Sequence, residues 1–134
     1  MNKIDTLIAY LFAIQAFAKD IHYSARGAAF YSKHLLADEI YKGIDEQIDA
    51  LIETCILPLG EAKHIISYWK GAETLFNNKK VDLKEDFWGL KHLIEECLDE
   101  LKTYNAISRG SQSLFDSIAQ DLQRKLGLIT RQVG

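Results

Sequence analysis

The stretch HYSARGAAFYSKH, residues 22–34, connects two segments that both have helical hydrophobic spacing. Before it, apolar residues recur every three or four positions, which predicts a helix over residues 3–24. After it, the same spacing predicts a helix over residues 29–56. That helix should stop before Pro58, because a proline disfavours helix in the residue ahead of it. The connector is short and contains Gly27, so we expect the two helices to pair as an antiparallel hairpin.

The middle of the chain has one shorter helical signal. An amphipathic stretch with Ile65, Ile66 and Trp69 predicts a short helix within residues 60–76. The polar residues 77–80 predict a turn after it.

Two more long helices are expected in the second half of the chain. Asp82 and Glu85 have the spacing of a capping box, which predicts the start of a third helix that ends near Ala106. A fourth helix follows the turn at residues 108–110. The expected apolar stripes are Phe87, Leu90, Ile94, Leu98 and Leu101 on the third helix, and Leu114, Ile118, Leu122, Leu126 and Ile129 on the fourth.

Together these segments predict an all-α fold. No segment alternates with a period of two for long enough to predict a strand. The connection between the second and third long helices is about two dozen residues, which is much longer than a bundle turn requires. We therefore expect a single domain over residues 1–134 with a ferritin-like four-helix bundle, in which the long crossover contains a short helix.

Composition limits the classes of function. The chain is 48% hydrophobic and 26% charged, which is typical of a globular domain. Its net charge of -3 argues against nucleic acid as a partner. No apolar stretch is long enough to span a bilayer, so no membrane association is expected. Cys55 and Cys97 lack metal-binding spacing and are expected to be buried free thiols, which suits a cytoplasmic location.

Four residues of the predicted helix 29–56 could bind a metal: His34, Asp38, Asp49 and Glu53. At about 100° per residue they lie within roughly one quadrant of the helix surface. His22, at the end of the preceding helix, can reach the start of this one across the short connector. Imidazole and carboxylate ligands together suit iron, zinc or manganese.

The length of the helix rules out one metal bound by all five residues of one chain. The 15 positions from His34 to Asp49 correspond to about 22 Å along a continuous helix. A two-fold axis would solve this, because the start of the helix in one subunit would then face the end of it in the other. We expect this axis near Gly43, which has no side chain to hold two helices apart. Two equivalent metal sites per dimer follow.

The same residues resemble the Dps-like mini-ferritins of the ferritin superfamily. The resemblance is carried by the spacing of His22, Tyr23, Gly27, Phe30, His34, Asp38, Tyr41, Asp49 and Glu53. It implies a hollow twelve-subunit shell that oxidises Fe(II) with hydrogen peroxide or dioxygen and stores ferric mineral. It also implies that His22, His34, Asp38, Asp49 and Glu53 are the ferroxidase ligands, shared between two subunits. Zinc could occupy the same ligands instead of iron.

The chain departs from the family pattern at two positions. Tyr23 stands where a tryptophan is usual, and it is the candidate electron donor near the metal. Thr54 stands where an arginine usually follows the last ligand. No lysine-rich segment precedes the first helix, so DNA binding through a basic arm is not expected.

Two alternatives remain open at this point. Glu61 and His64 have the spacing of a ligand pair of larger ferritins, but the partner helices lack the further ligands, which favours a solvated surface. The chain could also be a non-enzymatic ferritin-like assembly protein that binds structural zinc or no metal.

Overall fold

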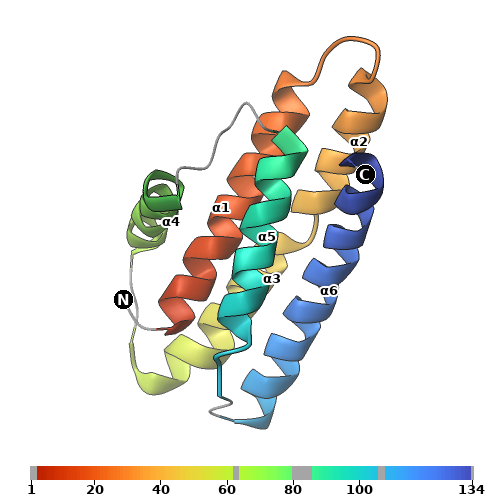
Figure 1. Cartoon of the computed structure of the whole chain (residues 1–134). Helices are drawn as coiled ribbons and strands as arrows, with labels where there is room; N and C mark the ends of the chain where they lie inside the picture. Colours follow the sequence, from red (N-terminus) through yellow and green to blue (C-terminus); the bar gives the residue numbers. More distant parts are fainter. Residues whose placement is uncertain (1–2, 62–63, 80–85, 106–107, 134) are drawn as a thin grey trace.

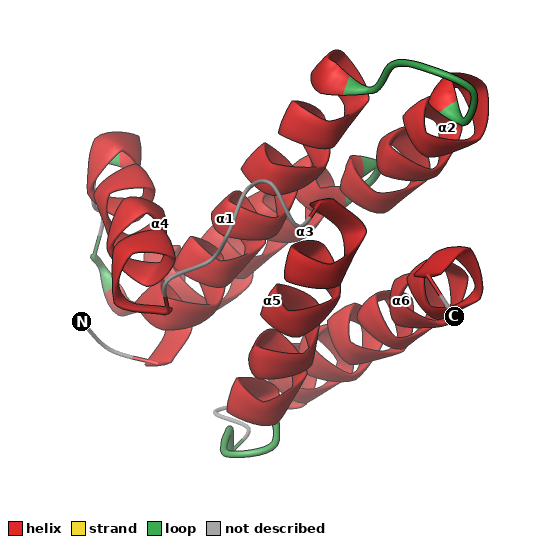
Figure 2. Ribbon diagram, turned by 45° about the horizontal axis from the view of Figure 1, so that its top comes forward, coloured by secondary structure: helices red, strands yellow, loops and turns green. Residues whose placement is uncertain are grey.

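The structure, a computed structural model, describes residues 3–61, 64–79, 86–105 and 108–133. Within these ranges every regular element is helical, which confirms the predicted all-α class (Figure 2). In the same ranges no helix is long and apolar enough to cross a membrane. The elements in chain order are α1 (Lys3–Ser24), α2 (Phe30–Tyr41), α3 (Ile44–Leu51), the π-helix η1 (Ile52–Ile56), the 3-10 helix η2 (Leu57–Leu59), α4 (Ile65–Lys79), α5 (Asp86–Leu101) and α6 (Arg109–Val133).

Helix α1 has the predicted bounds and is the most extensively covered helix (Figure 1). It packs against α2, α3, α4 and α5, while α6 packs against α5 and against the α2–α3 segment. Because neighbours lie on several sides, apolar residues are buried around most of the circumference of α1. The most deeply buried large side chains of α1 are Leu7, Ile8, Leu11, Ile14 and Phe17.

The predicted continuous helix over residues 29–56 is wrong. Helix α2 ends at Tyr41, Lys42 has an extended backbone with ψ 131°, and Gly43 has φ +83°. The positive φ interrupts the helix, and glycine takes it without the steric cost that a Cβ would bring. Helix α3 then starts a new helical segment, which continues into η1 and η2 and ends beyond Pro58. The rotation of residues across this break therefore cannot be derived from 100° per residue.

The crossover contains the expected short helix, α4. Helix α4 packs on α1 through Tyr68 and Ala72, which are buried. Ile65, Ile66 and Trp69 are each at least half exposed. The predicted turn was also wrong at residues 77–79, because α4 continues to Lys79.

Helices α5 and α6 form the second long hairpin. The predicted capping box at Asp82 and Glu85 lies outside the described residues, and α5 is described from Asp86. It ends at Leu101, earlier than predicted, and a turn follows. Helix α6 is capped by Ser108, whose Oγ accepts a hydrogen bond from the backbone N–H of Ser111 at 3.1 Å.

The hydrophobic core combines residues of all the long helices. In the predicted stripes Phe87, Leu90, Ile94, Ile118, Leu122 and Ile129 are buried, and the other members pack at the edge of the core. Cys55 and Cys97 are buried free thiols, as predicted.

Candidate metal centre

The connector between α1 and α2 brings the two ends of the hairpin into contact. Gly27 has φ +87°, and its carbonyl accepts a hydrogen bond from the N–H of Phe30 at 3.1 Å. The N–H of Ala25 bonds to the carbonyl of Ile21 at 2.9 Å, which continues the helical hydrogen bonds of α1 into the connector. This geometry reverses the chain within a few residues and places the first turns of α2 beside the last turn of α1.

His22 and His34 meet at this end of the hairpin. Their imidazole rings stack with centroids 3.7 Å apart and an interplanar angle of 22°. Each ring also bonds to the backbone of the other residue: His22 Nδ1 lies 3.1 Å from the His34 carbonyl oxygen, and His34 Nδ1 lies 3.0 Å from the His22 carbonyl oxygen. The predicted proximity of these two residues is confirmed.

These reciprocal hydrogen bonds determine the tautomer of both rings. A carbonyl oxygen can only accept, so the Nδ1 of each histidine must be the protonated donor. In the neutral imidazole this leaves Nε2 with a free lone pair, and Nε2 is a common metal-binding nitrogen. Histidines that bind metals usually donate their other N–H to a carbonyl or carboxylate in this way. The two side chains are thus held by hydrogen bonds typical of metal ligands.

Three aromatic side chains surround the histidine pair. Phe30 stacks on His34 with ring centroids 5.2 Å apart. Tyr23 and Tyr41 each approach His22 edge-on, with centroids 5.5 Å apart. Tyr23, the candidate electron donor, is 75% exposed, so it contacts the pair from the solvent side. These ring contacts limit the rotation of the imidazoles.

Asp38 reaches the pair through Tyr41. It lies one helical turn after His34 on the uninterrupted part of α2, so both side chains point to the same face. Burial raises the pKa of the Tyr41 phenol, and a hydrogen bond to the Asp38 carboxylate raises it further. Lys19 lies over the Tyr41 ring, with Nζ 5.6 Å from its centroid. Sequence reasoning counted Tyr41 in the family resemblance but assigned no site role to it or to Lys19, although Tyr41 follows His34 by two helical turns and shares its face.

Asp49 and Glu53 belong to a separate part of the chain. They lie beyond the Gly43 break, on α3 and η1, and both side chains are exposed. In the part of the chain that the structure describes, no three His, Cys, Asp or Glu residues lie close enough to hold a metal ion. A single chain therefore places two of the five predicted ligands in direct contact and leaves the two carboxylates beyond the break open to solvent.

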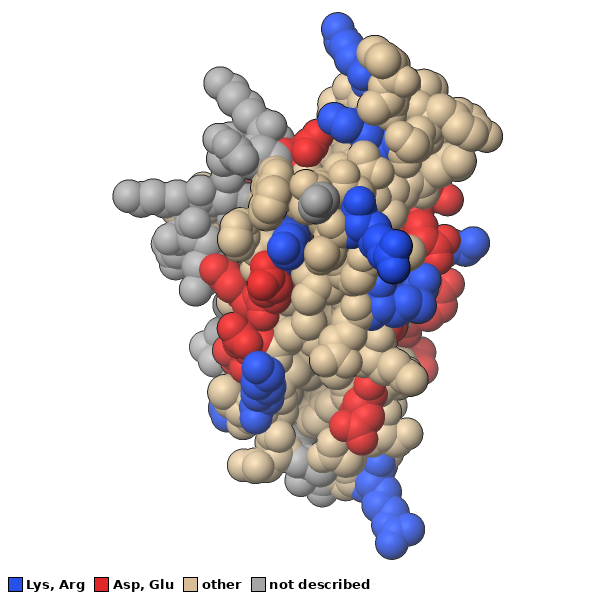
Figure 3. Space-filling model, turned by 45° about the vertical axis from the view of Figure 1, so that its right-hand side comes forward, with Lys and Arg blue, Asp and Glu red and all other residues tan. Residues whose placement is uncertain are grey.

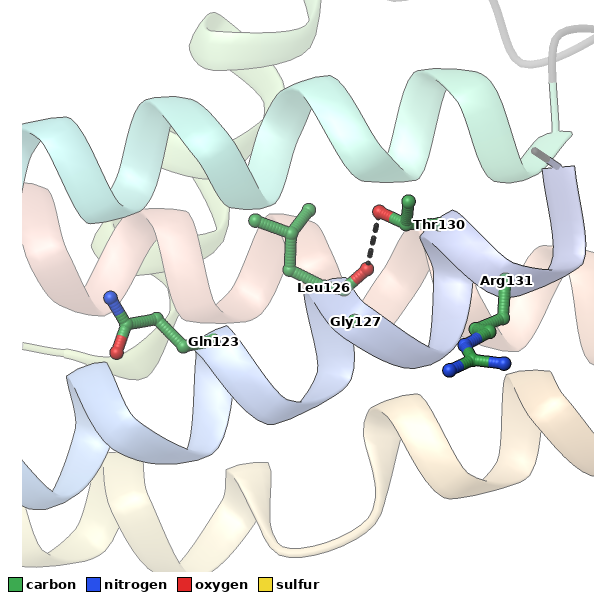
Figure 4. Close-up of a pocket in the computed structure, with 5 residues that line it drawn as sticks. All are labelled: Gln123, Leu126, Gly127, Thr130 and Arg131. Carbon is green, nitrogen blue, oxygen red and sulfur yellow. Dashed lines mark hydrogen bonds between the residues drawn. The ribbon is translucent and has the colours of Figure 1, made fainter.

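Other candidate features of the surface have little catalytic potential. Glu61 and His64 are both exposed. A shallow groove runs along α6, lined by Gln123, Leu126, Gly127, Thr130 and Arg131 (Figure 4). The hydroxyl of Thr130 donates to the Leu126 carbonyl at 2.9 Å and is thus satisfied within its own helix. The groove combines no acid with a base or nucleophile.

Charge on the visible face is mixed. Basic and acidic side chains lie next to one another over the surface in Figure 3, without one large basic field. An example is Arg124, which pairs with Glu39 at 3.0 Å and with Asp121 at 3.3 Å.

Comparisons with known proteins add no further assignment: no protein-family model matches the chain, and no curated protein or solved structure matches it significantly.

Proposed function

We propose that this chain is a mini-ferritin-type ferroxidase that binds Fe(II) between two subunits. The observation that carries the proposal is the reciprocal hydrogen bonding of His22 and His34, which leaves both Nε2 atoms free for a metal. The two rings stack with centroids 3.7 Å apart, and each is held by the backbone carbonyl of the other residue. Their orientation is therefore more fixed than that of surface histidines without such contacts. Asp38, on the same face of α2, is the third ligand that the proposal takes from this subunit.

A second copy of the chain would complete the site. Asp49 and Glu53 are exposed carboxylates four positions apart, and oxygen ligands suit the ferric product. In a two-fold dimer through α2 and α3, with Gly43 near the axis, they would face the histidines of the partner. Each dimer would then have two equivalent sites, each with two imidazoles and three carboxylates.

The reaction is an electron transfer from the bound substrate to peroxide. Two Fe(II) ions each give one electron to one hydrogen peroxide molecule. Its O–O bond breaks, two protons are taken up, and two water molecules form. The histidines and carboxylates hold the ions where peroxide can reach them, and the carboxylates stabilise the higher charge of Fe(III). Tyr23, exposed and in contact with His22, is the proposed auxiliary electron donor.

The proposed assembly is a closed shell of ferritin-like bundles. The order of the long helices, with the short α4 in the crossover between α3 and α5, supports a ferritin-like arrangement. A net charge of -3 per chain would attract Fe(II) to such a shell. Ferric mineral would be stored in its interior.

The shared site allows a complementation experiment. Fe(II) is added anaerobically to purified protein, peroxide follows, and the rise in ferric absorbance is recorded. We expect His34→Ala and Asp49→Ala, each purified alone, to lose at least about tenfold in rate. When the two variants are co-expressed, about half of the dimers are mixed. Each mixed dimer has one intact site of two, so about a quarter of the wild-type rate should return.

Controls separate this result from general damage. Glu73→Ala removes an exposed carboxylate from α4, away from the proposed dimer interface, and should keep the wild-type rate. Wild-type rates in both single variants would refute the site. Two inactive single variants without recovery in the mixture would refute the shared ligands. Stoichiometric zinc together with no ferric absorbance in the wild type would support a non-enzymatic assembly protein instead.

A further inference from the structure

The break between α2 and α3 is held by a buried lysine from α6. The Lys125 side chain is fully buried, with 0% of its surface exposed. Its Nζ donates to the Lys42 carbonyl oxygen at 2.9 Å and pairs with the Asp121 carboxylate at 2.9 Å. The Lys42 carbonyl lies at the interruption of the helix, where backbone carbonyls lack the usual helical partner. A buried ammonium needs such partners, so its position and that of the linker depend on each other.

The same turn of α6 also contacts both helices that flank the break. Asp121 accepts a hydrogen bond from Nε2 of Gln47 on α3 at 2.7 Å. Arg124 pairs with Glu39 on α2 at 3.0 Å. Asp121, Arg124 and Lys125, which we call the α6 clamp, thus bind α2, the linker and α3 from one helix. From α1, Nε2 of Gln15 donates to Asp45 at 2.5 Å, which adds a further contact to the first turn of α3.

The ionisation of Asp121 agrees with this arrangement. Burial alone would raise the pKa of its carboxyl group. The hydrogen bonds from Lys125 and Gln47 outweigh that effect and lower the pKa below its usual range. Asp121 is therefore a carboxylate at neutral pH, as the ion pair with Lys125 requires.

We infer that Asp121 and Lys125 are positioning residues for the proposed metal centre, acting through the angle between α2 and α3. This inference rests on the proposed function. His34 and Asp38 lie before the break, and Asp49 and Glu53 lie after it, so the angle determines where one half of the site lies relative to the other. Asp49 and Glu53 are about 9 to 15 Å from Gly43 along the chain, so a rotation of about 10° at the break moves them by roughly 2 Å. A displacement of that size removes a ligand from its metal.

The test compares one clamp variant and one linker variant with a matched control. Lys125→Met with Asp121→Asn replaces both partners of the buried pair without leaving a lone charge. Gly43→Ala disturbs the same break from the linker side, and it keeps the test meaningful if the double variant does not fold. Lys102→Met removes an exposed lysine that pairs with Asp99, and serves as the control. Circular dichroism and native mass are recorded for each protein.

The first measurement is independent of metal binding. Spin labels are attached at Ser32→Cys on α2 and Glu46→Cys on α3, both exposed positions, and the distance between them is measured by double electron–electron resonance. Unlabelled chains dilute the labelled ones, so that only distances within one chain are seen. We expect a narrow distance distribution in the wild type and the control. The distribution should be shifted or broadened in both the clamp variant and the linker variant. Unchanged distributions would refute the clamp.

The second measurement uses Co(II) as the probe of the site. The Co(II) affinity and the visible absorption spectrum are compared with those of His34→Ala. The clamp variant and the linker variant should both bind Co(II) at least tenfold more weakly than the wild type, with an altered spectrum. Their helicity and mass should stay unchanged. Wild-type affinity and spectrum in the variants would refute the positioning role and leave the proposed function intact. Wild-type protein that binds Co(II) no better than His34→Ala would refute the proposed function and the positioning role with it, while the label distances still report on the clamp.

Discussion

At the scale of single residues, the most informative feature is the mutual fixation of His22 and His34. Each imidazole is oriented by the backbone of the other residue, so neither orientation depends on a flexible side chain. Ring stacking with Phe30 and edge contacts with Tyr23 and Tyr41 limit the rotation of the imidazoles further. The proposed ligand pair is therefore preorganised, so little side-chain entropy would be lost on metal binding.

Tyr10 gives a residue-scale prediction about alkaline stability. Burial, and then the negative charge of Glu96, raise the pKa of its phenol to about 12. In the unfolded chain the phenol ionises near pH 10. Its contribution to stability is therefore complete below about pH 10 and is lost as the pH rises towards 12. Tyr10→Phe should remove part of this loss, on the order of 1 to 2 kcal/mol at pH 11.5.

Urea unfolding at pH 8 and pH 11.5 measures this difference. Tyr23→Phe is the control, because Tyr23 is 75% exposed. Equal losses of stability in wild type and Tyr10→Phe would contradict the assignment. Tyr104 also has a raised pKa, caused chiefly by burial, so some alkaline loss should remain in the variant.

At the scale of elements, the break at Gly43 separates two halves of what the sequence predicts as one helix. The interruption needs a residue that accepts φ +83°, and it needs partners for the carbonyl that the helix no longer satisfies. Gly43 accepts the positive φ, and the Lys125 ammonium donates a hydrogen bond to the Lys42 carbonyl. Tertiary contacts from both α1 and α6 therefore hold the break in place.

Gly43 and Gly127 give a paired prediction at this scale. Nothing lies within 4 Å of a Cβ added at either position, so backbone conformation alone decides the outcome. Gly43→Ala should destabilise the protein by about 1 to 2 kcal/mol, because an alanine pays that cost in the left-handed region. Gly127→Ala, inside α6, should stabilise it by about 0.5 to 1 kcal/mol through helix propensity.

The free energy of unfolding in urea distinguishes the two substitutions. Gly43→Asn should cost less than Gly43→Ala, because asparagine tolerates the left-handed region better. If Gly43→Ala were neutral, the positive φ at the break would be wrong.

At the scale of the whole molecule, the single chain leaves large apolar side chains in contact with water. Tyr31, Leu35, Leu57 and Trp69 are all at least 48% exposed. Exposed apolar groups of this size often mark surfaces that are covered in an assembly. Tyr31 lies one turn before His34, so it shares the face of α2 on which the proposed second subunit would pack.

Tyr31→Asp tests this surface. Burial of a large side chain contributes about 1.5 to 3 kcal/mol, so a charge in its place should weaken the dimer at least tenfold. Light scattering should show a wild-type particle larger than one chain and a smaller particle for the variant. Ser113→Asp, at an exposed position of α6, is the control for added charge. A monomeric wild-type protein would contradict the proposed assembly.

Much of the fold follows from local patterns in the sequence. The predicted bounds of α1 are confirmed, and so is the proximity of His22 and His34, because helical spacing and a short connector with Gly27 are local properties. The buried face of α4 was not specified in this way: Tyr68 and Ala72 are buried, while Ile65, Ile66 and Trp69 are at least half exposed. Periodicity alone does not determine which side of a short helix meets α1.

The sequence by itself determined the all-α class, the first helix, the tight first hairpin and the candidate ligands at their spacing. Only the tertiary structure decided the bend at Gly43 and the tautomers of the two histidines. The reason is the distance along the chain between interacting groups. Lys125 lies 83 positions after the Lys42 carbonyl that it binds, and His34 lies 12 positions after its partner His22. Local hydrophobic spacing predicts that His22 and His34 are close, but it contains no information about which backbone carbonyls their Nδ1 atoms and the Lys125 ammonium meet, and packing brings these groups together.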